Sequence, residues 1–314
     1  MVRFAVRRLF SAIALLFAIS VLTFLIFFAM PDSNPALRLA GRTATAVQIQ
    51  GIEREWGFNK PIYVQYYKTM EKIFNGSVIS YTQQLNVEQQ IVQDLPPTLS
   101  LAIGAGIIWF FFGVVFGVLA AVRAGRLLDR ALTVLSLIGV STPVFFLGAM
   151  LSFYLGFKAG LFPNGNYVNI TTSPLQWLRH MILPWFTLSA VFIGVYSRVL
   201  RSTILDMVNE DFVRTARAKG LTERQVMIRH VLRNSLLPMI TIFAGILPGL
   251  LGGSVIIEYI FSIPGMGQLG YTATLSRDLP VLQALTFIGA IVSMVCLLLQ
   301  DICYAIADPR VSYD

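Results

Sequence analysis

Charged side chains are scarce in this sequence. Asp, Glu, Lys and Arg make up only 13% of its 314 residues, whereas hydrophobic residues make up 56%. A soluble domain usually carries about a quarter charged residues, which is enough to cover a water-facing surface. The scarcity of charge therefore excludes a soluble globular protein and predicts an integral membrane protein.

Histidine and cysteine are scarcer still. His180 and His230 flank apolar runs rather than lying inside them, and no HExxH motif occurs. Cys296 and Cys303 would lie about two turns apart on one helix face, too far for a disulfide. The dipeptide Gly-Lys is also missing, which excludes a Walker A phosphate loop. We therefore expect no metal site, no catalytic triad and no ATPase site in this chain.

The apolar residues form six runs, each long enough to cross a bilayer as a helix, which needs about 20 residues. The first run follows Arg3, Arg7 and Arg8, and it ends without a small-x-small cleavage site. We therefore interpret it as a retained span rather than a cleaved signal peptide. The predicted fold is all-α with six transmembrane helices, over residues 9–30, 99–122, 131–157, 181–200, 236–261 and 281–307.

The positions of Lys and Arg predict the orientation. If the N-terminus is inside, the inner segments hold 15 of the 24 Lys and Arg residues. Of the nine outer ones, six lie in residues 31–97, a segment long enough to be translocated largely regardless of charge. Both termini are therefore predicted to be cytoplasmic. The net charge of +8 follows from this bias and requires no nucleic-acid partner.

Three segments are expected. Residues 1–97 contain the first span and an external segment, 98–307 form the main transmembrane domain, and 308–314 form a cytoplasmic tail. In the external segment Pro61 can open a helix, and tyrosines at one-face spacing follow it, so short helices are expected there. Pro96-Pro97 is expected to mark the entry to the second span.

Ionisable residues are nearly absent from the cores of the predicted spans. Arg198 and Asp301 lie toward inner ends, and Glu258 lies at an outer end. Ion-coupled carriers and membrane enzymes usually place charges at depth. We therefore expect a transport protein driven by a partner. A stand-alone channel or a secondary carrier is the main alternative, although no inverted repeat with paired broken helices supports it.

Small and helix-breaking residues interrupt several spans instead. Gly113 and Gly117 form a small-xxx-small pair that permits close helix packing. Breaks free backbone groups that water or a neighbour must satisfy, so they favour protein-facing or cavity-lining positions. Kinks in a simple packed bundle are the alternative. The candidate residues for a translocation path are Ser141, Thr142, Pro143, Pro248, Gly252 and Gly253.

The segment between the fourth and fifth spans is polar and periodic. Asn209, Glu210 and Asp211 supply a helix start, with acid near the positive end of the helix dipole. Phe212, Ala216 and Gly220 then recur at i, i+4 spacing. We expect them to share one face and Gly220 to end the helix.

A second short helix is expected directly after Gly220, because residues 222–225 read Thr-Glu-Arg-Gln, a capping-box pattern. Small residues at 216 and 220 would let a partner approach closely, and Arg214, Arg217 and Lys219 add positive charge. The pattern favours a helix docked into a groove of another protein. An amphipathic connector lying on anionic lipid is the alternative.

Residues 210–221 read EDFVRTARAKGL and residues 230–238 read HVLRNSLLP. This segment resembles the EAA-type loop of ABC-importer permeases, specifically the DppB/OppB-like branch of the dipeptide/oligopeptide/nickel permease family. Arg-Thr-Ala at 214–216 replaces Glu-Ala-Ala, whereas Gly220 is kept. The resemblance covers nearly the whole chain, including residues 57–66, 264–269 and 308–313.

This resemblance implies a type I ABC importer transmembrane fold in a bacterial inner membrane. The chain would form half of a pore with a homologous second permease (DppC/OppC-like), two cytoplasmic ATPase subunits and an extracytoplasmic binding protein. ATP and Mg²⁺ would bind the ATPases, and this chain would hold no cofactor. Peptides are the cargo that the resemblance implies, with nickel, glutathione or an oligosaccharide as alternatives.

The resemblance also implies roles for two segments. Pro264, Gly265 and Gly267 are expected to form an outward turn that contacts the binding protein, with a pore plug or a plain turn as alternatives. The ATPase-coupling loop would comprise Asp211, Phe212, Arg214, Thr215, Ala216, Arg217, Lys219, Gly220 and Leu221.

Overall fold

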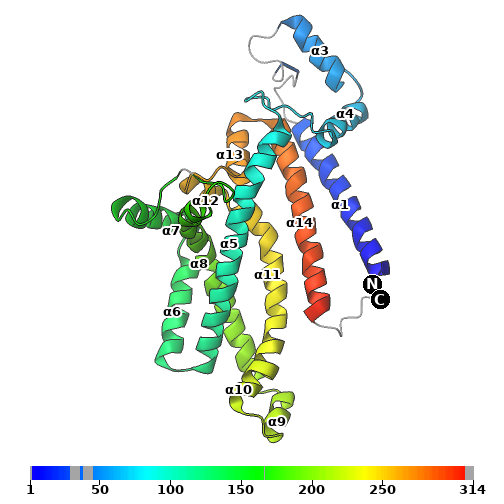
Figure 1. The fold of residues 1–314 in the computed structure, drawn as a ribbon. Coiled ribbons are helices and arrows are strands. Elements are labelled where there is room, and N and C mark those ends of the chain that lie inside the picture. The colour runs from blue at the N-terminus through cyan, green and yellow to red at the C-terminus, as the bar shows by residue number, and fades with distance from the viewer. Residues whose placement is uncertain (1, 29–35, 38–44, 166, 308–314) are drawn as a thin grey trace. The chain divides into compact units, whose positions relative to one another are not determined.

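The computed structural model describes residues 2–28, 36–37, 45–165 and 167–307 (Figure 1). Over these residues the chain is helical, and extended pairing is limited to one isolated bridge between Ile79 and Asn86. The predicted all-α class is therefore confirmed. The first half contains α1 (Val2–Phe28), α3 (Ala46–Trp56), α4 (Ile62–Phe74), α5 (Val87–Val122), α6 (Leu127–Ser141), α7 (Val144–Leu151) and the π-helix η1 (Ser152–Lys158).

The second half begins with the longest of its helices, α8 (Pro174–Met207). The remaining elements are α9 (Asp211–Ala218), α10 (Glu223–Val226), the π-helix η2 (Met227–Leu232), α11 (Arg233–Gly253), α12 (Val255–Ile260), α13 (Met266–Ser276) and α14 (Leu279–Ala307).

The chain divides into two compact units. The first combines residues 1–96 with 264–295, and the second combines residues 97–263 with 296–312. Two long helices, α5 and α14, each contribute to both units.

Among the described residues, three helices are long and apolar enough to cross a membrane: α5, α8 and the Leu279–Leu298 part of α14. If α6 and the helix over 144–158 together form one bent span, the number of candidate spans among these residues is four. The apolar stretch described in α1 is shorter, from Phe10 to Ile26. The end of the first predicted span, residues 29–30, and the predicted tail 308–314 lie outside the described residues.

Prolines lie inside two of the long helices. α5 begins at Val87 and continues through Pro96 and Pro97, so the helix starts about ten residues before the expected entry to the second span. Pro184 likewise lies inside α8 without ending it. Proline removes one backbone hydrogen bond, and neighbouring helices can stabilise the remaining turns of a long apolar helix.

The core of the second unit lies where α5, α8 and α11 meet. Trp109 is fully buried, and its ring centroid lies 5.1 Å from that of Phe192 and 4.7 Å from that of Phe243. The buried Tyr196 hydroxyl donates a hydrogen bond to the carbonyl of Met239 over 3.0 Å. Each helix therefore contributes an aromatic side chain to one cluster, which fixes their mutual register.

Close approach of the helix backbones supports this core. A Cβ placed on Gly113 would lie 2.7 Å from the Tyr196 ring, and one on Gly117 would lie 2.9 Å from the Ser197 carbonyl. The predicted small-xxx-small contact is therefore confirmed, with α8 as its partner. On another side of α8, a Cβ on Gly194 would clash with the Ser136 carbonyl of α6.

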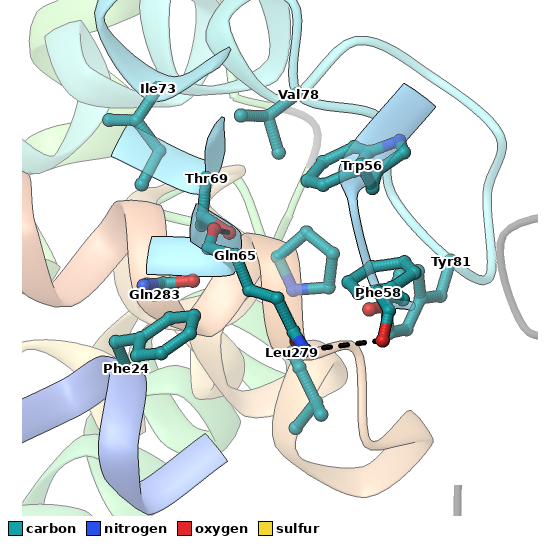
Figure 2. Close-up of a pocket in the computed structure, with 11 residues that line it drawn as sticks. Phe24, Trp56, Phe58, Gln65, Thr69, Ile73, Val78, Tyr81, Leu279 and Gln283 are labelled. Atoms are coloured by element: carbon teal, nitrogen blue, oxygen red, sulfur yellow. Dashed lines mark hydrogen bonds between the residues drawn. The ribbon is translucent and has the colours of Figure 1, made fainter. Parts of the chain in front are cut away.

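In the first unit short helices form between the first and second predicted spans, as expected. Pro61 is the N-cap of α4 rather than its first residue, and Gly57 ends α3 with φ +73°. The Gln65 side chain donates to the Phe58 carbonyl at 3.1 Å (Figure 2) and to the Lys60 carbonyl at 2.8 Å, which holds the connection between the two helices.

Candidate functional site

The predicted coupling loop consists of two helices, α9 and α10, joined by a tight turn, and we call residues 211–226 the elbow. Helix α9 begins after Glu210, which caps it without a side-chain hydrogen bond. The chain reverses at Gly220, whose φ of +80° is a left-handed conformation that favours glycine. Thr222 and Gln225 then form the predicted capping box of α10. In Figure 1, α9 and α10 project beyond the ends of α8 and α11.

The second helix of the elbow is not short, contrary to the prediction. α10 passes directly into η2 and then into α11, so helical structure continues from Glu223 to Gly253. The helix continues through Pro238 and Pro248, two residues that usually favour a helix break. One arm of the elbow is therefore continuous with α11, which holds most of the fifth predicted span, residues 236–261.

The elbow packs on its own unit through Val213 and Ala216. Their side chains are 0% and 5% exposed and belong to the same core cluster as Leu200 and Ile204 of α8. The prediction that Ala216 shares a partner-facing surface with Phe212 and Gly220 is therefore wrong. At 100° per residue, the face opposite Val213 and Ala216 carries Asp211, Arg214, Thr215 and Ala218, all exposed.

The other predicted coupling residues surround that free face. Phe212 is 38% exposed, Lys219 is exposed, and Leu221 is half-buried against the core. No described atom lies within 4 Å of a Cβ built on Gly220. The space beside Gly220 is therefore open in this chain.

An ion pair closes the elbow across its turn. The Arg217 guanidinium donates to both carboxylate oxygens of Glu223, with Nε–Oε1 at 2.8 Å and an Nη2–Oε2 distance of 3.3 Å. The same guanidinium reaches the carbonyl of Val208 at 3.5 Å. A bidentate contact of this kind fixes the relative orientation of the two side chains and also pairs their charges. Arg217 therefore joins the two arms of the elbow instead of presenting an unpaired charge.

A second ion pair ties α8 to the start of α6. Arg201 Nε and Nη2 donate to the two oxygens of Asp129 at 2.6 and 2.7 Å, and the Asp129 side chain is 5% exposed. Asp129 also accepts from the Gly125 N–H at 2.8 Å. This contact fixes the loop before α6, and sequence reasoning missed it because it joins residues 72 positions apart.

Ser141, Thr142 and Pro143 form a sharp break, as predicted. α6 ends at Ser141, α7 begins at Val144, and the helix over 144–158 turns by 100° from α6 (Figure 1). The Thr142 hydroxyl and backbone N–H both donate to the Ile138 carbonyl, at 2.7 and 3.0 Å, and these two bonds close the end of α6. Pro248, Gly252 and Gly253 lie within α11, and their surroundings fall outside the described part of the chain.

Glu258 is, besides Asp129, a buried carboxyl group of the second unit. Its side chain is 0% exposed, and its Oε1 accepts hydrogen bonds from Thr98 at 2.8 Å and from Ser254 at 2.9 Å. Ser254 is the residue between α11 and α12. Glu258 therefore connects that junction to α5, and the hydroxyls supply part of the hydrogen bonding that a buried carboxylate requires.

The segment of Pro264, Gly265 and Gly267 leads into helix α13. Pro264 is exposed, but Gly265 and Gly267 are buried, and Gly265 is the N-cap of α13. The segment is thus the start of an 11-residue helix rather than a plain turn. Among its three residues, Pro264 is the one with exposed surface.

Asp278, which lies between α13 and α14, is hydrogen-bonded to the turn at residues 80–82. Its carboxylate accepts from the Ser80 and Thr82 hydroxyls at 2.5 and 2.6 Å, and from the backbone N–H groups of Tyr81 and Thr82, each at 3.0 Å. Asp278 is 1% exposed. Four donors converge on one carboxylate, so the 80–82 turn is held firmly against the start of α14.

A small cavity of about 60 Å³ lies in the first unit, lined by residues of α1, α3, α4 and α14 (Figure 2). Its wall is mostly aromatic and aliphatic, and it includes Phe24 and Trp56. The volume suits about one or two water molecules rather than a solute. Among the described residues, no group of three His, Cys, Asp or Glu side chains could hold a metal ion.

Comparison with known proteins identifies the chain. Residues 113–313 match the family described as binding-protein-dependent transport system inner membrane component, and residues 1–102 match its N-terminal region. The oligopeptide transport system permease protein AppB of Bacillus subtilis is 37% identical over 317 residues, which cover 100% of both chains. The dipeptide permease DppB of Lactococcus lactis is 36% identical, with 99% of each chain covered.

A third relative, the glutathione transport system permease protein GsiC of Escherichia coli, is 33% identical over 100% of both chains. Among solved structures, an inward-facing MetNI methionine ABC transporter chain matches with a TM-score of 0.57 and 18% identity. The match covers 70% of this chain and 97% of that one, and it supports a type I importer-like fold. Proteins of this kind are transport subunits, and ATP hydrolysis resides in their partners. The chain belongs to the family of inner-membrane permease components of binding-protein-dependent ABC transport systems.

Proposed function

We propose that the chain forms half of the translocation pathway of an importer for di- and oligopeptides. The support for this cargo is the full-length similarity to permeases named for oligopeptides, dipeptides and glutathione. The second half would be a homologous DppC/OppC-like permease, with two ATPases in the cytoplasm and an extracytoplasmic binding protein.

The proposed topology has six spans with both termini in the cytoplasm. It counts α1, α5, the bent pair of α6 with the 144–158 helix, α8, α11 with α12, and α14. The distribution of Lys and Arg supports this orientation. The elbow would then face the ATPases, whereas α3, α4 and α13 would face the binding protein.

Within this proposal the elbow transmits ATPase movement to the spans. Its buried side packs on α8 through Val213 and Ala216, and its second arm continues into α11. The free face around Thr215, together with the open space at Gly220, would meet a groove of an ATPase. The observation that carries this role is the rigid packing of the elbow on two spanning helices.

An uptake assay tests the function. The chain and its genetic neighbours are expressed in bacteria that lack peptide uptake, and ATP-dependent accumulation of radiolabelled trialanine is measured. We expect uptake that requires this chain, the ATPases and the binding protein. Uptake without nucleotide, or uptake of nickel or an oligosaccharide but no peptide, would overturn the proposal.

Two substitutions test docking of the elbow. Gly220→Trp fills the open space with a large side chain, whereas Gly220→Ala imposes the same backbone strain with a small one. We expect Gly220→Trp to abolish transport and substrate-stimulated ATP hydrolysis with normal membrane insertion, and Gly220→Ala to keep most of both. Equal losses would attribute the effect to strain, and normal transport by Gly220→Trp would refute docking.

A further inference from the structure

The connection between α5 and α6 carries positive charge that no contact neutralises. Arg123 and Arg126 lie in this connection, and Arg130 follows in the first turn of α6. All three side chains are exposed. In the part of the chain that the structure describes, none of the three guanidinium groups forms a hydrogen bond or an ion pair. These groups are therefore free to bind an anion from outside the chain.

The backbone holds the three arginines close together. The Arg126 N–H donates to the Arg123 carbonyl at 3.0 Å, and the Arg130 N–H donates to the Arg126 carbonyl at 3.1 Å. Residues three and four positions apart in helical turns have Cβ atoms about 5–6 Å apart. Gly125 permits the tight turn with a φ of +78°. Three long cationic side chains can therefore reach one anionic group.

The acidic residue of α6, Asp129, does not offset this charge. Its two carboxylate oxygens accept from the guanidinium of Arg201 at 2.6 and 2.7 Å, and its side chain is 5% exposed. Asp129 also accepts from the Gly125 N–H at 2.8 Å, so it ties the turn to α8. The carboxylate thus fixes the support of the three arginines and leaves their own charges unpaired.

An apolar stripe on α6 begins beside these arginines. Leu127, Val134 and Ile138 are 82%, 56% and 57% exposed. At 100° per residue they share one face, opposite Ser136, whose hydroxyl is hydrogen-bonded to α8. Arg130 flanks the first turn of this stripe. Positive charge at one end and apolar surface along the rest match the two parts of an anionic phospholipid.

The position of this surface favours a lipid over a soluble ligand. The arginines directly follow α5, a helix long and apolar enough to cross a membrane. Within the second unit they lie toward the same end of the helices as the elbow (Figure 1), which the proposed topology places in the cytoplasm. Anionic lipids give the cytoplasmic leaflet a negative surface potential that attracts basic side chains. A free phosphate would leave the apolar stripe unused.

We propose that Arg123, Arg126 and Arg130 bind the headgroup phosphate of an anionic phospholipid whose acyl chain lies along the apolar stripe of α6. The choice of the cytoplasmic leaflet rests on the proposed function, because that function places the elbow beside the ATPases. The contact itself depends on the charge and exposure of these residues.

The experiment uses the complete importer in nanodiscs, with Cys296 and Cys303 replaced by serine and a bimane fluorophore attached at Val134→Cys. Lipids with brominated acyl chains quench the fluorophore when they lie beside it. Quenching is measured against the mole fraction of brominated phosphatidylglycerol and, separately, of brominated phosphatidylcholine. We expect half-maximal quenching at about tenfold less phosphatidylglycerol than phosphatidylcholine.

Two triple variants test the role of the arginines. Changing all three to glutamine should abolish the preference for phosphatidylglycerol. Changing all three to lysine should keep most of it, because lysine also binds phosphate as a point charge. The lysine variant therefore separates loss of charge from damage to the fold.

A pair of single variants supplies a matched control. Arg130→Gln removes one charge from the site and should lower the preference several-fold. Arg179→Gln removes the same charge from an exposed position near the start of α8 and should leave the preference unchanged. Equal effects of the two variants would attribute the preference to net charge and overturn the proposed site.

Other results would also overturn the inference. Equal quenching by both lipids in the wild type would exclude selective binding, and no quenching by either lipid would assign the α6 stripe to a protein contact. Loss of the preference in inorganic phosphate at constant ionic strength would assign the arginines to a soluble anion. Peptide-stimulated ATP hydrolysis in the same nanodiscs tests the proposed function separately. Absence of stimulation with the lipid preference intact would refute that function and leave the lipid site standing.

Discussion

At the residue scale, glycines determine how closely α8 approaches its neighbours. Gly194 is the tightest case, because any Cβ there would meet the Ser136 carbonyl of α6, which is backbone and cannot rotate away. Gly245 in α11 offers the opposite case, with no described atom within 4 Å of an added Cβ. Substitutions at these two positions therefore distinguish the effect of steric packing on stability from the effect of helix propensity.

We predict that Gly194→Ala destabilises the protein by about 1–3 kcal/mol through overpacking, whereas Gly245→Ala is neutral or stabilises it by up to about 1 kcal/mol. The apparent melting temperature of the purified protein in detergent measures both. Equal melting temperatures for the two variants would show that α6 and α8 separate easily at this contact.

Asp278 is the residue that holds the 80–82 turn in place. We predict that Asp278→Asn weakens the attachment of the 80–82 turn by about 1–3 kcal/mol, because an amide presents one acceptor where the carboxylate presents two. Faster amide hydrogen exchange at Tyr81 and Thr82 is the expected result. Asp206→Asn, at an exposed position, is the control and should leave exchange there unchanged.

At the element scale, the elbow acts as one piece because an ion pair and a buried face hold its arms together. Charge reversal tests this. We predict that Glu223→Arg lowers peptide-stimulated ATP hydrolysis several-fold, because it sets two cations against each other across the Gly220 turn. Combining it with Arg217→Glu should restore most of the activity.

The same double variant distinguishes two roles for Arg217. If Arg217 contacted the ATPase directly, reversing its charge would add a second defect, and no restoration would occur. Restoration in the double variant is expected only when the two side chains act chiefly on each other.

At the scale of the whole molecule, topology is the main prediction. Tyr63 in α4 is 71% exposed, and Thr215 in α9 is also exposed. With Cys296 and Cys303 replaced by serine, we predict that a membrane-impermeant maleimide labels Tyr63→Cys on intact cells. Thr215→Cys should be labelled only after the membrane is opened.

This pair of sites also tests the bent helix. Three crossings separate the two positions if α6 and the 144–158 helix together span the membrane, and two if that pair turns back. Labelling of both cysteines from the same side would therefore show a re-entrant pair. The reverse of the expected pattern would place the termini outside.

Local features of the fold could be predicted from the sequence. The apolar runs predicted helices, the capping box at Thr222 predicted the start of α10, and Gly220 predicted the reversal, because each depends on a few neighbouring residues. The continuation of α5 through Pro96 and Pro97 and of α8 through Pro184 could not be predicted in this way, since tertiary packing outweighs the loss of single backbone hydrogen bonds.

The sequence by itself thus determined an all-helical membrane chain with a glycine-closed elbow, because hydrophobicity, capping and φ preference act over a few residues. The tertiary structure decided which face of α9 is free, how sharply α6 and α7 bend, and which partners Glu258 and Asp278 find. Those partners lie 160 and 198 positions away. Helical periodicity carries no information over such separations, and only packing in three dimensions brings these groups together.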